Sequence, residues 1–96
     1  MSFANRLRAV IKEERLSQAK FAAEIGISRP AVEKYLSETT DPAGWVMLKI
    51  TNHATFKKYA LWLMTGDTAP ESGQVCPDFS IQEQCGLVDE ESRKQA

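Results

Sequence analysis

The side chains with the most distinctive chemistry in this 96-residue sequence lie between Ser28 and Lys34. Arg29 carries a planar fork of N–H donors that fits the O6 and N7 acceptors of guanine in the major groove of DNA, and Lys34 can reach the same acceptors or a phosphate. Pro30 cannot donate a hydrogen bond, so it offers only apolar contact to a thymine methyl group. Glu33 could accept a bond from cytosine N4 or repel phosphates, but its place four residues after Arg29 favours a role in holding that side chain. Together with Ser28, these residues are candidates for reading bases.

Basic side chains upstream of this cluster are candidates for binding the DNA backbone. Such contacts supply the salt-dependent part of the affinity and little sequence preference. For each of them the alternative is an ordinary solvated helix face. The candidates are Arg6, Arg8, Lys12 and Lys20.

Two short helices are predicted to position these residues. Ser17 is the expected cap of the first helix, and Gly26 is expected to end it in the left-handed conformation. Ser28 caps the second helix only two residues later, with Pro30 in its first turn, where the missing N–H costs nothing. Residues 16–37 therefore predict a helix-turn-helix, in which the second helix can enter a major groove while the first lies across the backbone.

Apolar side chains at helical spacing predict which faces turn inward. The second helix of the pair should bury Val32, Tyr35 and Leu36 and leave the base-reading candidates outside. The same periodicity and the capping residues predict three more helices, at 3–15 after Ser2, 42–52 after Asp41 and 56–65 after Thr55, the last ended by Gly66.

The helix at 56–65 is more apolar than one core contact requires. At about 100° per residue its inward stripe holds Phe56, Tyr59, Ala60, Leu63 and Met64. Leu61 and Trp62 lie off this stripe, so they either still contact the core or form a subunit interface. A homodimer is expected because one helix-turn-helix reads too few base pairs to single out a genomic site. The expected dimer contacts are Leu61, Trp62, Val75, Phe79 and Ile81, with a loosely packed tail as the alternative for residues 74–85.

After Gly66 the sequence becomes rich in proline, glycine and acidic residues. Short alternations at 74–76 and 79–81 predict brief strands, and the end of the chain is expected to be mobile. The predicted organisation is a DNA-binding domain at 1–66, an extended dimerisation segment at 67–86 and a mobile acidic tail at 87–96.

Charge is distributed unevenly along the chain, although the formal net charge is -1. Residues 1–66 hold ten basic and six acidic side chains, a balance of +4, whereas residues 67–96 hold two basic and seven acidic ones, a balance of -5. Such an asymmetry points to a nucleic-acid or membrane partner for the basic part. We expect the acidic part to lie away from the phosphates.

Residues 3–37 resemble the lambda-repressor-like (Cro and C-repressor) helix-turn-helix family in the spacing of Leu16-Ser17-Gln18, Ala19, Ala22, Gly26, Ile27, Ser28, Val32 and Tyr35. The resemblance implies that Gln18 binds a backbone phosphate and that Ser28, Arg29, Pro30 and Lys34 face the groove. A second similarity, over residues 56–65 and 69–74 and in total length, is to the immunity repressors (protein C) of the peduoviruses. It implies a small dimeric repressor that holds the lysogenic state by blocking the early lytic promoter.

The expected fold class is therefore mainly α, a five-helix lambda-repressor-like helix-turn-helix domain with a short C-terminal extended or β segment at the dimer interface. The expected partners are a double-stranded DNA operator and a second copy of the chain. A Cro-type lytic regulator or an antitoxin would use the same DNA-binding unit, and an interaction module that has lost DNA binding is a third alternative.

Features of other protein classes are absent from the sequence. His53 is the only histidine and has no motif around it, so no catalytic site is expected. Cys76 and Cys85 fit neither a metal site nor a disulfide scaffold, and we expect two reduced thiols and no metal or cofactor. No small-molecule ligand is evident. The longest strongly apolar run, Tyr59 to Met64, is far shorter than the ~20 residues of a membrane span, and no secretory signal begins the chain. The expected location is the cytoplasm of a bacterial host cell.

Overall fold

The computed structural model describes residues 3–37 and 40–87. Six α-helices and two short 3₁₀-helices follow one another in these residues: α1 (Phe3–Glu13), α2 (Gln18–Ile25), α3 (Arg29–Leu36), α4 (Gly44–Thr51), η1 (Lys57–Tyr59), α5 (Ala60–Thr65), η2 (Pro70–Ser72) and α6 (Phe79–Gln84). The described residues contain no β-strand, and one isolated antiparallel bridge joins Ala69 to Gln74. The prediction of a mainly helical fold is confirmed.

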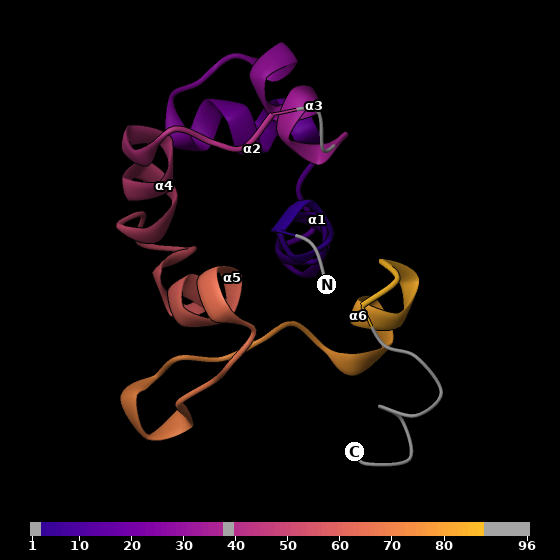
Figure 1. The fold of residues 1–96 in the computed structure, drawn as a ribbon, viewed down its shortest axis with the longest axis vertical. Coiled ribbons are helices and arrows are strands. Elements are labelled where there is room, and N and C mark those ends of the chain that lie inside the picture. Colours follow the sequence, from indigo (N-terminus) through magenta and orange to yellow (C-terminus); the bar gives the residue numbers. More distant parts are fainter. Residues whose placement is uncertain (1–2, 38–39, 88–96) are drawn as a thin grey trace.

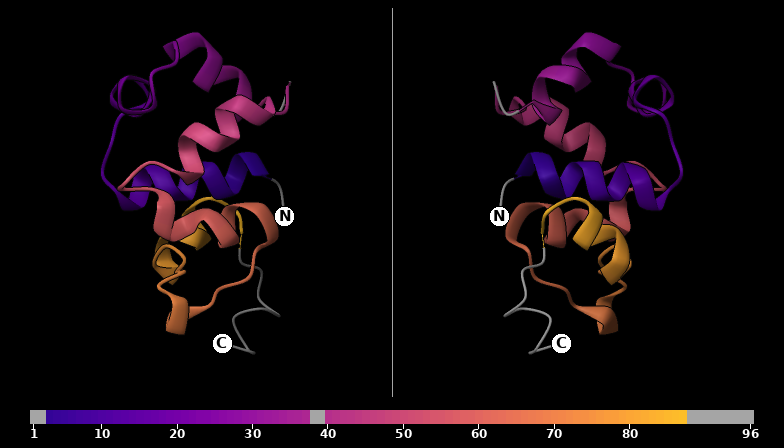
Figure 2. Two further views of the ribbon diagram at one scale, coloured as in Figure 1. Left: turned by 90° about the vertical axis from the view of Figure 1, so that its left-hand side faces the viewer. Right: turned by 90° about the vertical axis from the view of Figure 1, so that its right-hand side faces the viewer.

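Helix α1 lies at the centre of the molecule (Figures 1 and 2), where it contacts α3, α5 and α6. The pair α2 and α3 forms one end, and α5 and α6 lie on the opposite side of α1, with α4 connecting the two ends along one side. Side chains from all these helices meet in one core, whose fully buried members include Leu7, Val10, Phe21, Val32, Val46, Ile50, Phe56 and Leu63. The buried side chains of α2 and α3 belong to this core, which fixes the helix-turn-helix at one end of the molecule.

Helix α1 buries the face that its periodicity predicted, although it ends earlier than expected. Leu7, Val10 and Ile11 are buried, and Phe3 packs against the core. The helix stops at Glu13 because Arg15 takes a left-handed conformation (φ 57°) and Leu16 N–H donates to Ile11 O at 3.1 Å. The predicted cap Ser2 lies outside the described residues.

Helix α4 is shorter than predicted at its beginning. Ala43 is extended (φ -65°, ψ 158°) and stands at the N-cap without a side-chain hydrogen bond. The expectation that Asp41 caps a helix starting at residue 42 is therefore wrong. Helical geometry begins at Gly44, and the inward side chains are Val46 and Ile50.

The helix predicted at 56–65 is divided into a 3₁₀ turn and an α-helix, and this division changes which side chains face inward. A 3₁₀-helix turns 120° per residue instead of 100°, so the three residues of η1 rotate the following face by about 60°. Trp62 thereby enters the core with 3% of its surface exposed, and Met64 turns outward with 55% exposed. Trp62 has no surface left for a partner, so its assignment to a dimer interface is wrong, and the alternative of core contact holds.

The expected cap of this helix is also wrong. Thr55 provides no side-chain cap. Phe56 and Tyr59 occupy the N-cap positions of η1 and α5, and neither position has a side-chain capping hydrogen bond. The backbone N–H of Thr55 instead donates to Nδ1 of His53 at 3.0 Å. Gly66 ends α5 in the left-handed conformation (φ 83°), as predicted.

The C-terminal segment folds back onto the domain and ends in a helix, not a strand. Gln74 bonds to Leu61 N and Lys57 O, and Val75 N–H donates to Lys58 O at 2.8 Å. The strand predicted at 79–81 is wrong, because Asp78 caps α6 by accepting from Ser80 N at 2.9 Å. Of the predicted strand at 74–76, only the bridge at Gln74 is β-structure.

Helix α6 packs on α1, and the residues that follow it reach the core. Cys85 and Leu87 are 6% and 8% exposed. The predicted mobile tail begins at Leu87, which is packed, and its other residues, 88–96, lie outside the described part of the chain. Within that described part, no helix has the length and apolar character needed to cross a membrane.

Candidate nucleic-acid interface

The helix-turn-helix has the capping geometry that the sequence predicts. The Ser17 hydroxyl accepts from Lys20 N at 3.0 Å, and the Ser28 hydroxyl accepts from Ala31 N at 3.2 Å. Between the two helices Gly26 is left-handed (φ 74°, ψ 36°), and its N–H donates to Ala22 O. Serine oxygens satisfy N–H groups that have no partner within a helix, and glycine takes the left-handed turn without steric strain. Each predicted boundary of this unit is therefore fixed by a local interaction.

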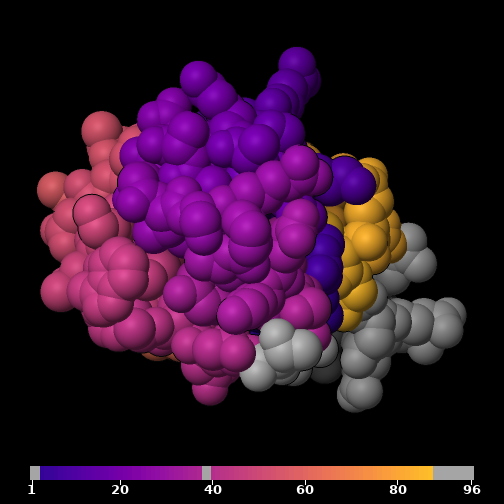
Figure 3. Space-filling model, turned by 90° about the horizontal axis from the view of Figure 1, so that it is seen from above, coloured from indigo at the N-terminus to yellow at the C-terminus, as the bar shows by residue number. Residues whose placement is uncertain are grey.

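Helix α3 buries one side and exposes the other. Val32 and Leu36 are buried and Tyr35 packs partly against the core, as predicted. The five base-reading candidates Ser28, Arg29, Pro30, Glu33 and Lys34 are all exposed. Seen from above, α2 and α3 cover the centre of this face of the molecule (Figure 3). The outer side of α3 is thus presented on an accessible surface by a rigid, capped helix.

Arg29 and Glu33 form an ion pair on this surface. Nε of Arg29 lies 3.3 Å from Oε1 of Glu33, and the two side chains are 63% and 54% exposed. The pair agrees with the expected contact between Glu33 and Arg29. Because the contact uses Nε, the two terminal guanidinium nitrogens can still donate to the two acceptors of a guanine edge.

Ser28, Pro30 and Lys34 complete the exposed face of α3. The Ser28 oxygen is the acceptor in the N-cap bond, which leaves its hydroxyl hydrogen for an external acceptor. Pro30 stands in the first turn, and Lys34 lies one turn further along the helix. The arrangement offers an apolar ring at the start of the helix and cations at both ends of the face.

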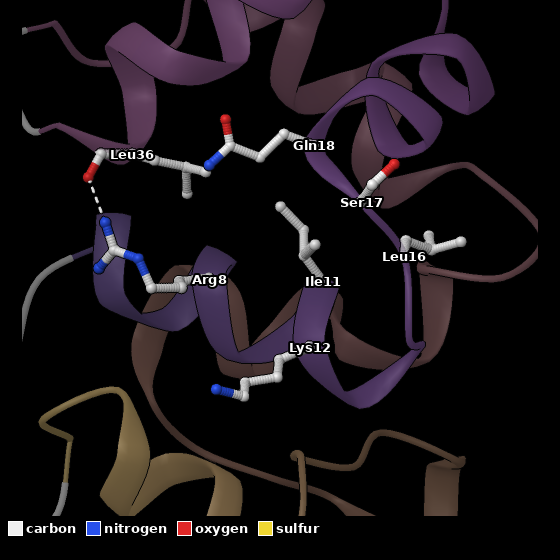
Figure 4. A pocket seen from close by; sticks show the side chains of 7 residues that line it. All are labelled: Arg8, Ile11, Lys12, Leu16, Ser17, Gln18 and Leu36. Carbon is white, nitrogen blue, oxygen red and sulfur yellow. Dashed lines mark hydrogen bonds between the residues drawn. The ribbon is translucent and has the colours of Figure 1, made fainter.

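A cleft between α1, α2 and the end of α3 gathers three of the predicted backbone-binding residues (Figure 4). We call it the basic cleft. It is an open hollow of about 340 Å³ lined by Arg8, Ile11, Lys12, Leu16, Ser17, Gln18 and Leu36. Its chemistry combines two cations, a side-chain amide at the start of a helix and an apolar floor, which suits a phosphate beside a sugar.

Arg8 has a structural contact as well as its place in the cleft. One terminal nitrogen donates to Leu36 O at 2.6 Å and the other to Oδ1 of Asn5 at 2.7 Å. The first bond places a cation at the C-terminus of α3, where carbonyl oxygens carry partial negative charge. Lys12 is exposed, and no ion pair or hydrogen bond of its ammonium group occurs among the described residues.

The remaining two backbone candidates lie in different places. Lys20 is exposed on α2 and is not among the residues that line the cleft. Arg6 is directed to the other side of α1, where its Nε donates to Leu63 O at 2.9 Å in the last turn of α5. Because α5 lies across α1 from the helix-turn-helix, the structure does not bring Arg6 together with the other candidates. Arg6 joins α1 to α5.

The structure adds one cation that the sequence analysis did not select. Nζ of Lys49, in the last turn of α4, would lie 3.9 Å from a β-carbon built on Gly26. Lys49 is exposed and stands beside the turn that precedes Arg29. Sequence alone carries no signal for this position, because only the packing of α4 brings it to the turn.

The apolar side chains expected at a dimer interface differ in exposure. Phe79 is 40% exposed, whereas Leu61, Val75 and Ile81 are partly buried. Leu61 shares the outer side of α5 with the exposed Met64, three residues later. Two further large apolar side chains are exposed on α4: Trp45 at 57% and Leu48 at 63%.

His53 is engaged in structural contacts. His53 accepts from Thr55 N through Nδ1, and its Nε2 lies 3.4 Å from Glu24 Oε2, so it ties α2 to the segment after α4. Cys76 and Cys85 are free thiols. In the described part of the chain, no three His, Cys, Asp or Glu side chains are placed to hold a metal ion.

Between Gly66 and Leu87, the acidic segment lies away from the outer side of α3. The turn with η2 is at the end of the molecule opposite α2 and α3 (Figure 1), and α6 lies beside α1. Neither η2 nor α6 therefore contacts the outer side of α3 among the described residues.

Comparisons with known proteins agree with this architecture. A helix-turn-helix family model matches residues 7–53, from the middle of α1 to just past the end of α4. The repressor protein C of Escherichia phage P2 is 38% identical over 66 residues, covering 69% of this chain and 67% of the relative. Its family is one of DNA-binding regulators rather than enzymes. The chain therefore belongs to the lambda-repressor-like helix-turn-helix family of DNA-binding repressors.

Proposed function

We propose that the chain is the repressor of a temperate phage, binding a double-stranded DNA operator in the bacterial cytoplasm and blocking the early lytic promoter, and so maintaining lysogeny. The observation that carries this proposal is the exposed outer face of α3, where Arg29 is held by Glu33 on a capped helix. The similarity to a phage protein named repressor protein C supports the biological setting.

In this proposal the two parts of the interface have different tasks. Arg29, Lys34 and Ser28 donate to base edges, and Pro30 contacts a thymine methyl group. Glu33 orients Arg29. The basic cleft receives the phosphate backbone through Arg8, Lys12 and Gln18, and Lys20 and Lys49 extend the positive surface on either side.

The proposed repressor acts as a homodimer, because one recognition helix reads too few base pairs for a unique site. Its interface includes the outer side of α5. Leu61 and Met64 lie there one turn apart. The Leu61 N–H donates to Oε1 of Gln74 and the Val75 N–H donates to Lys58 O, and these bonds bring the C-terminal segment beside them. Phe79 and Ile81 on α6 are also included in the proposed interface.

The proposal is tested by titrating the purified protein against a fragment of the early promoter and a scrambled fragment of equal length, at several salt concentrations. A specific repressor binds the promoter at least about 10³-fold more tightly. Both affinities fall with salt, because counterions are released from the phosphates. A reporter driven by the same promoter should be silenced when the chain is expressed. Equal binding to both fragments would refute the proposal.

A further inference from the structure

Arg15 has a backbone conformation that arginine rarely takes. Its φ is 57°, and among residues 3–37 and 40–87 it is the only residue other than glycine with a positive φ. In this left-handed region the β-carbon lies too close to the following carbonyl oxygen, so most residues other than glycine are strained there. Arginine at this position therefore lowers the stability of the fold relative to glycine.

The hydrogen bonds that end α1 need this backbone conformation but no side chain. The N–H of Arg15 donates to Lys12 O at 3.0 Å, and the N–H of Leu16 donates to Ile11 O at 3.1 Å. Together the two bonds form the C-terminal helix motif whose left-handed residue is usually glycine. Because a glycine would make the same bonds, the end of the helix does not account for an arginine at position 15.

The Arg15 side chain also makes no polar contact that would offset the strain. It is exposed, and its guanidinium has no ion pair or hydrogen bond within the described part of the chain. The two carboxylates that precede it have other partners, because Glu13 accepts from the N-cap residue of α6 and Glu14 pairs with Lys58. The positive charge of Arg15 is therefore available to an external ligand.

This charge adjoins the basic cleft. Lys12, whose carbonyl oxygen accepts from Arg15 N, and Leu16, the next residue in the chain, both line the cleft (Figure 4). Arg15 is not among the lining residues, so its cation adds to those of Arg8 and Lys12 from just outside the cleft. An anion longer than one phosphate group, such as a nucleic-acid strand, is the ligand that such an extended positive surface suits.

We propose that Arg15 is a further DNA-binding residue, whose guanidinium binds a phosphate next to the one held in the basic cleft. This inference rests on the proposed function of the cleft. It accounts for the strained arginine, because a contact made only with DNA improves binding and leaves the free protein less stable. Since phosphates carry no sequence information, Arg15 raises the affinity for every duplex by the same factor.

The test measures stability and affinity in the same full-length variant. Arg15→Gly should raise the melting temperature by about 4 °C, because glycine takes the left-handed conformation without strain. The same variant should bind the promoter fragment and a random duplex about threefold or more weakly at low salt, and its salt slope should fall by about 1. Thermal unfolding and fluorescence anisotropy measure the two effects.

Two control variants separate the phosphate contact from other causes. Lys57→Gln removes the same charge from an exposed position on η1, so it should leave both affinities nearly unchanged. Arg15→Lys keeps the charge and the strain, so it should bind DNA almost as tightly as the wild type and gain no stability.

The possible failures can be told apart. If the wild type binds DNA and Arg15→Gly loses no more affinity than Lys57→Gln, Arg15 makes no contact with phosphate and the proposal is wrong. A lower melting temperature of Arg15→Gly would show that the side chain stabilises the fold, which also contradicts the proposal. A wild type that binds neither duplex would overturn the proposed function itself, and this inference with it.

Discussion

In the proposed interface, the ion pair of Arg29 and Glu33 favours selectivity over affinity. Their ion pair is exposed, so it contributes little to stability, at most about 0.5 kcal/mol for an i,i+4 pair. Its use is geometric, because it restricts the Arg29 side chain to one side of α3. The carboxylate also repels phosphates, which disfavours any docking that places the backbone where a base edge should be.

Replacing Glu33 with Gln should therefore separate selectivity from stability. The variant loses the ion pair and one negative charge at the interface, so it should bind random DNA more tightly and discriminate less between promoter and random duplexes. Its free energy of unfolding should change by less than about 0.5 kcal/mol. Urea unfolding and parallel DNA titrations measure the two effects. An unchanged ratio of specific to random affinity would show that Glu33 has no part in selectivity.

Tyr59 is a second residue whose chemistry can be tested, and its role is structural. Its hydroxyl donates to Oε2 of Glu14 at 2.5 Å, and Nζ of Lys58 lies 3.3 Å from the same oxygen. These contacts fix η1 to the end of α1. Burial raises the pKa of Tyr59 above its ordinary value, and the hydrogen bond to the Glu14 carboxylate raises it further.

The raised pKa of Tyr59 makes stability depend on pH in the alkaline range. A tyrosine in the unfolded chain ionises near pH 10, whereas the folded chain keeps its proton at higher pH. The contribution of Tyr59 is therefore complete below about pH 10 and is lost as pH rises towards the folded pKa. Tyr59→Phe should lose about 1 kcal/mol at pH 8 and show a smaller further loss at pH 10.5 than the wild type.

Urea unfolding at the two pH values, with Tyr35→Phe as control for removing a phenol, tests this prediction. A Tyr59→Phe variant that loses as much stability as the wild type between pH 8 and pH 10.5 would contradict it.

At the scale of elements, the turn between α2 and α3 determines where the recognition helix points. Gly26 has φ 74°, and the Lys49 ammonium is its nearest neighbour at the position of a side chain. A residue with a β-carbon is strained by about 1–2 kcal/mol in this conformation. The turn therefore requires glycine because of its left-handed backbone conformation, and not because a β-carbon would clash with a neighbouring atom.

Gly26→Ala should destabilise the protein by about 1 kcal/mol or more and weaken promoter binding, because the turn must shift to relieve the strain. Gly44→Ala is the matched control. Gly44 begins α4 with no atom within 4 Å of a built β-carbon and without a positive φ, so alanine should be neutral or stabilising there. Thermal unfolding of both variants measures the difference, and equal melting temperatures would contradict the account of the turn.

The elements also show what could be predicted from the sequence. Caps and turns formed by adjacent residues, such as Ser17, Gly26 and Ser28, were predictable because each boundary depends on a local hydrogen bond or a left-handed residue. The exposed face of α3, which holds the base-reading candidates, followed from its helical period. The whole helix-turn-helix was therefore within reach of sequence reasoning.

The errors arose where the helical period changed or where distant segments meet. The 3₁₀ turn η1 rotates α5 and moves Trp62 inward and Met64 outward, which a constant 100° per residue cannot reveal. Residues 79–81 are helical despite their strand-like alternation, because Asp78 caps α6. The contact of Arg6 with α5 was not predicted and Lys49 was not selected, because only the packing of α5 and α4 decides which side of the molecule they occupy.

At the scale of the whole molecule, the proposed dimer interface can be located by testing two exposed apolar surfaces, one on α5 and one on α4. Met64 on α5 is 55% exposed and Leu48 on α4 is 63% exposed, so glutamate should disturb the monomer little at either position. Met64→Glu should give monomers in sedimentation velocity, because a charge at the proposed interface cannot be buried without a partner. Leu48→Glu should remain dimeric.

Circular dichroism of both variants controls for folding. The opposite result, a dimer with Met64→Glu and a monomer with Leu48→Glu, would move the interface to α4.

The central claim is that the outer face of α3 reads bases while the other cations bind only phosphates. The most direct test measures the affinities of wild type, Arg29→Ala and Lys20→Ala for the operator and for versions with each base pair replaced in turn, at two salt concentrations. Arg29→Ala should lose about 1–3 kcal/mol on the operator and become indifferent to one base pair, whereas Lys20→Ala should weaken all sequences alike and reduce the salt slope by about 1. If Arg29→Ala weakens operator and random DNA equally, the claim is wrong.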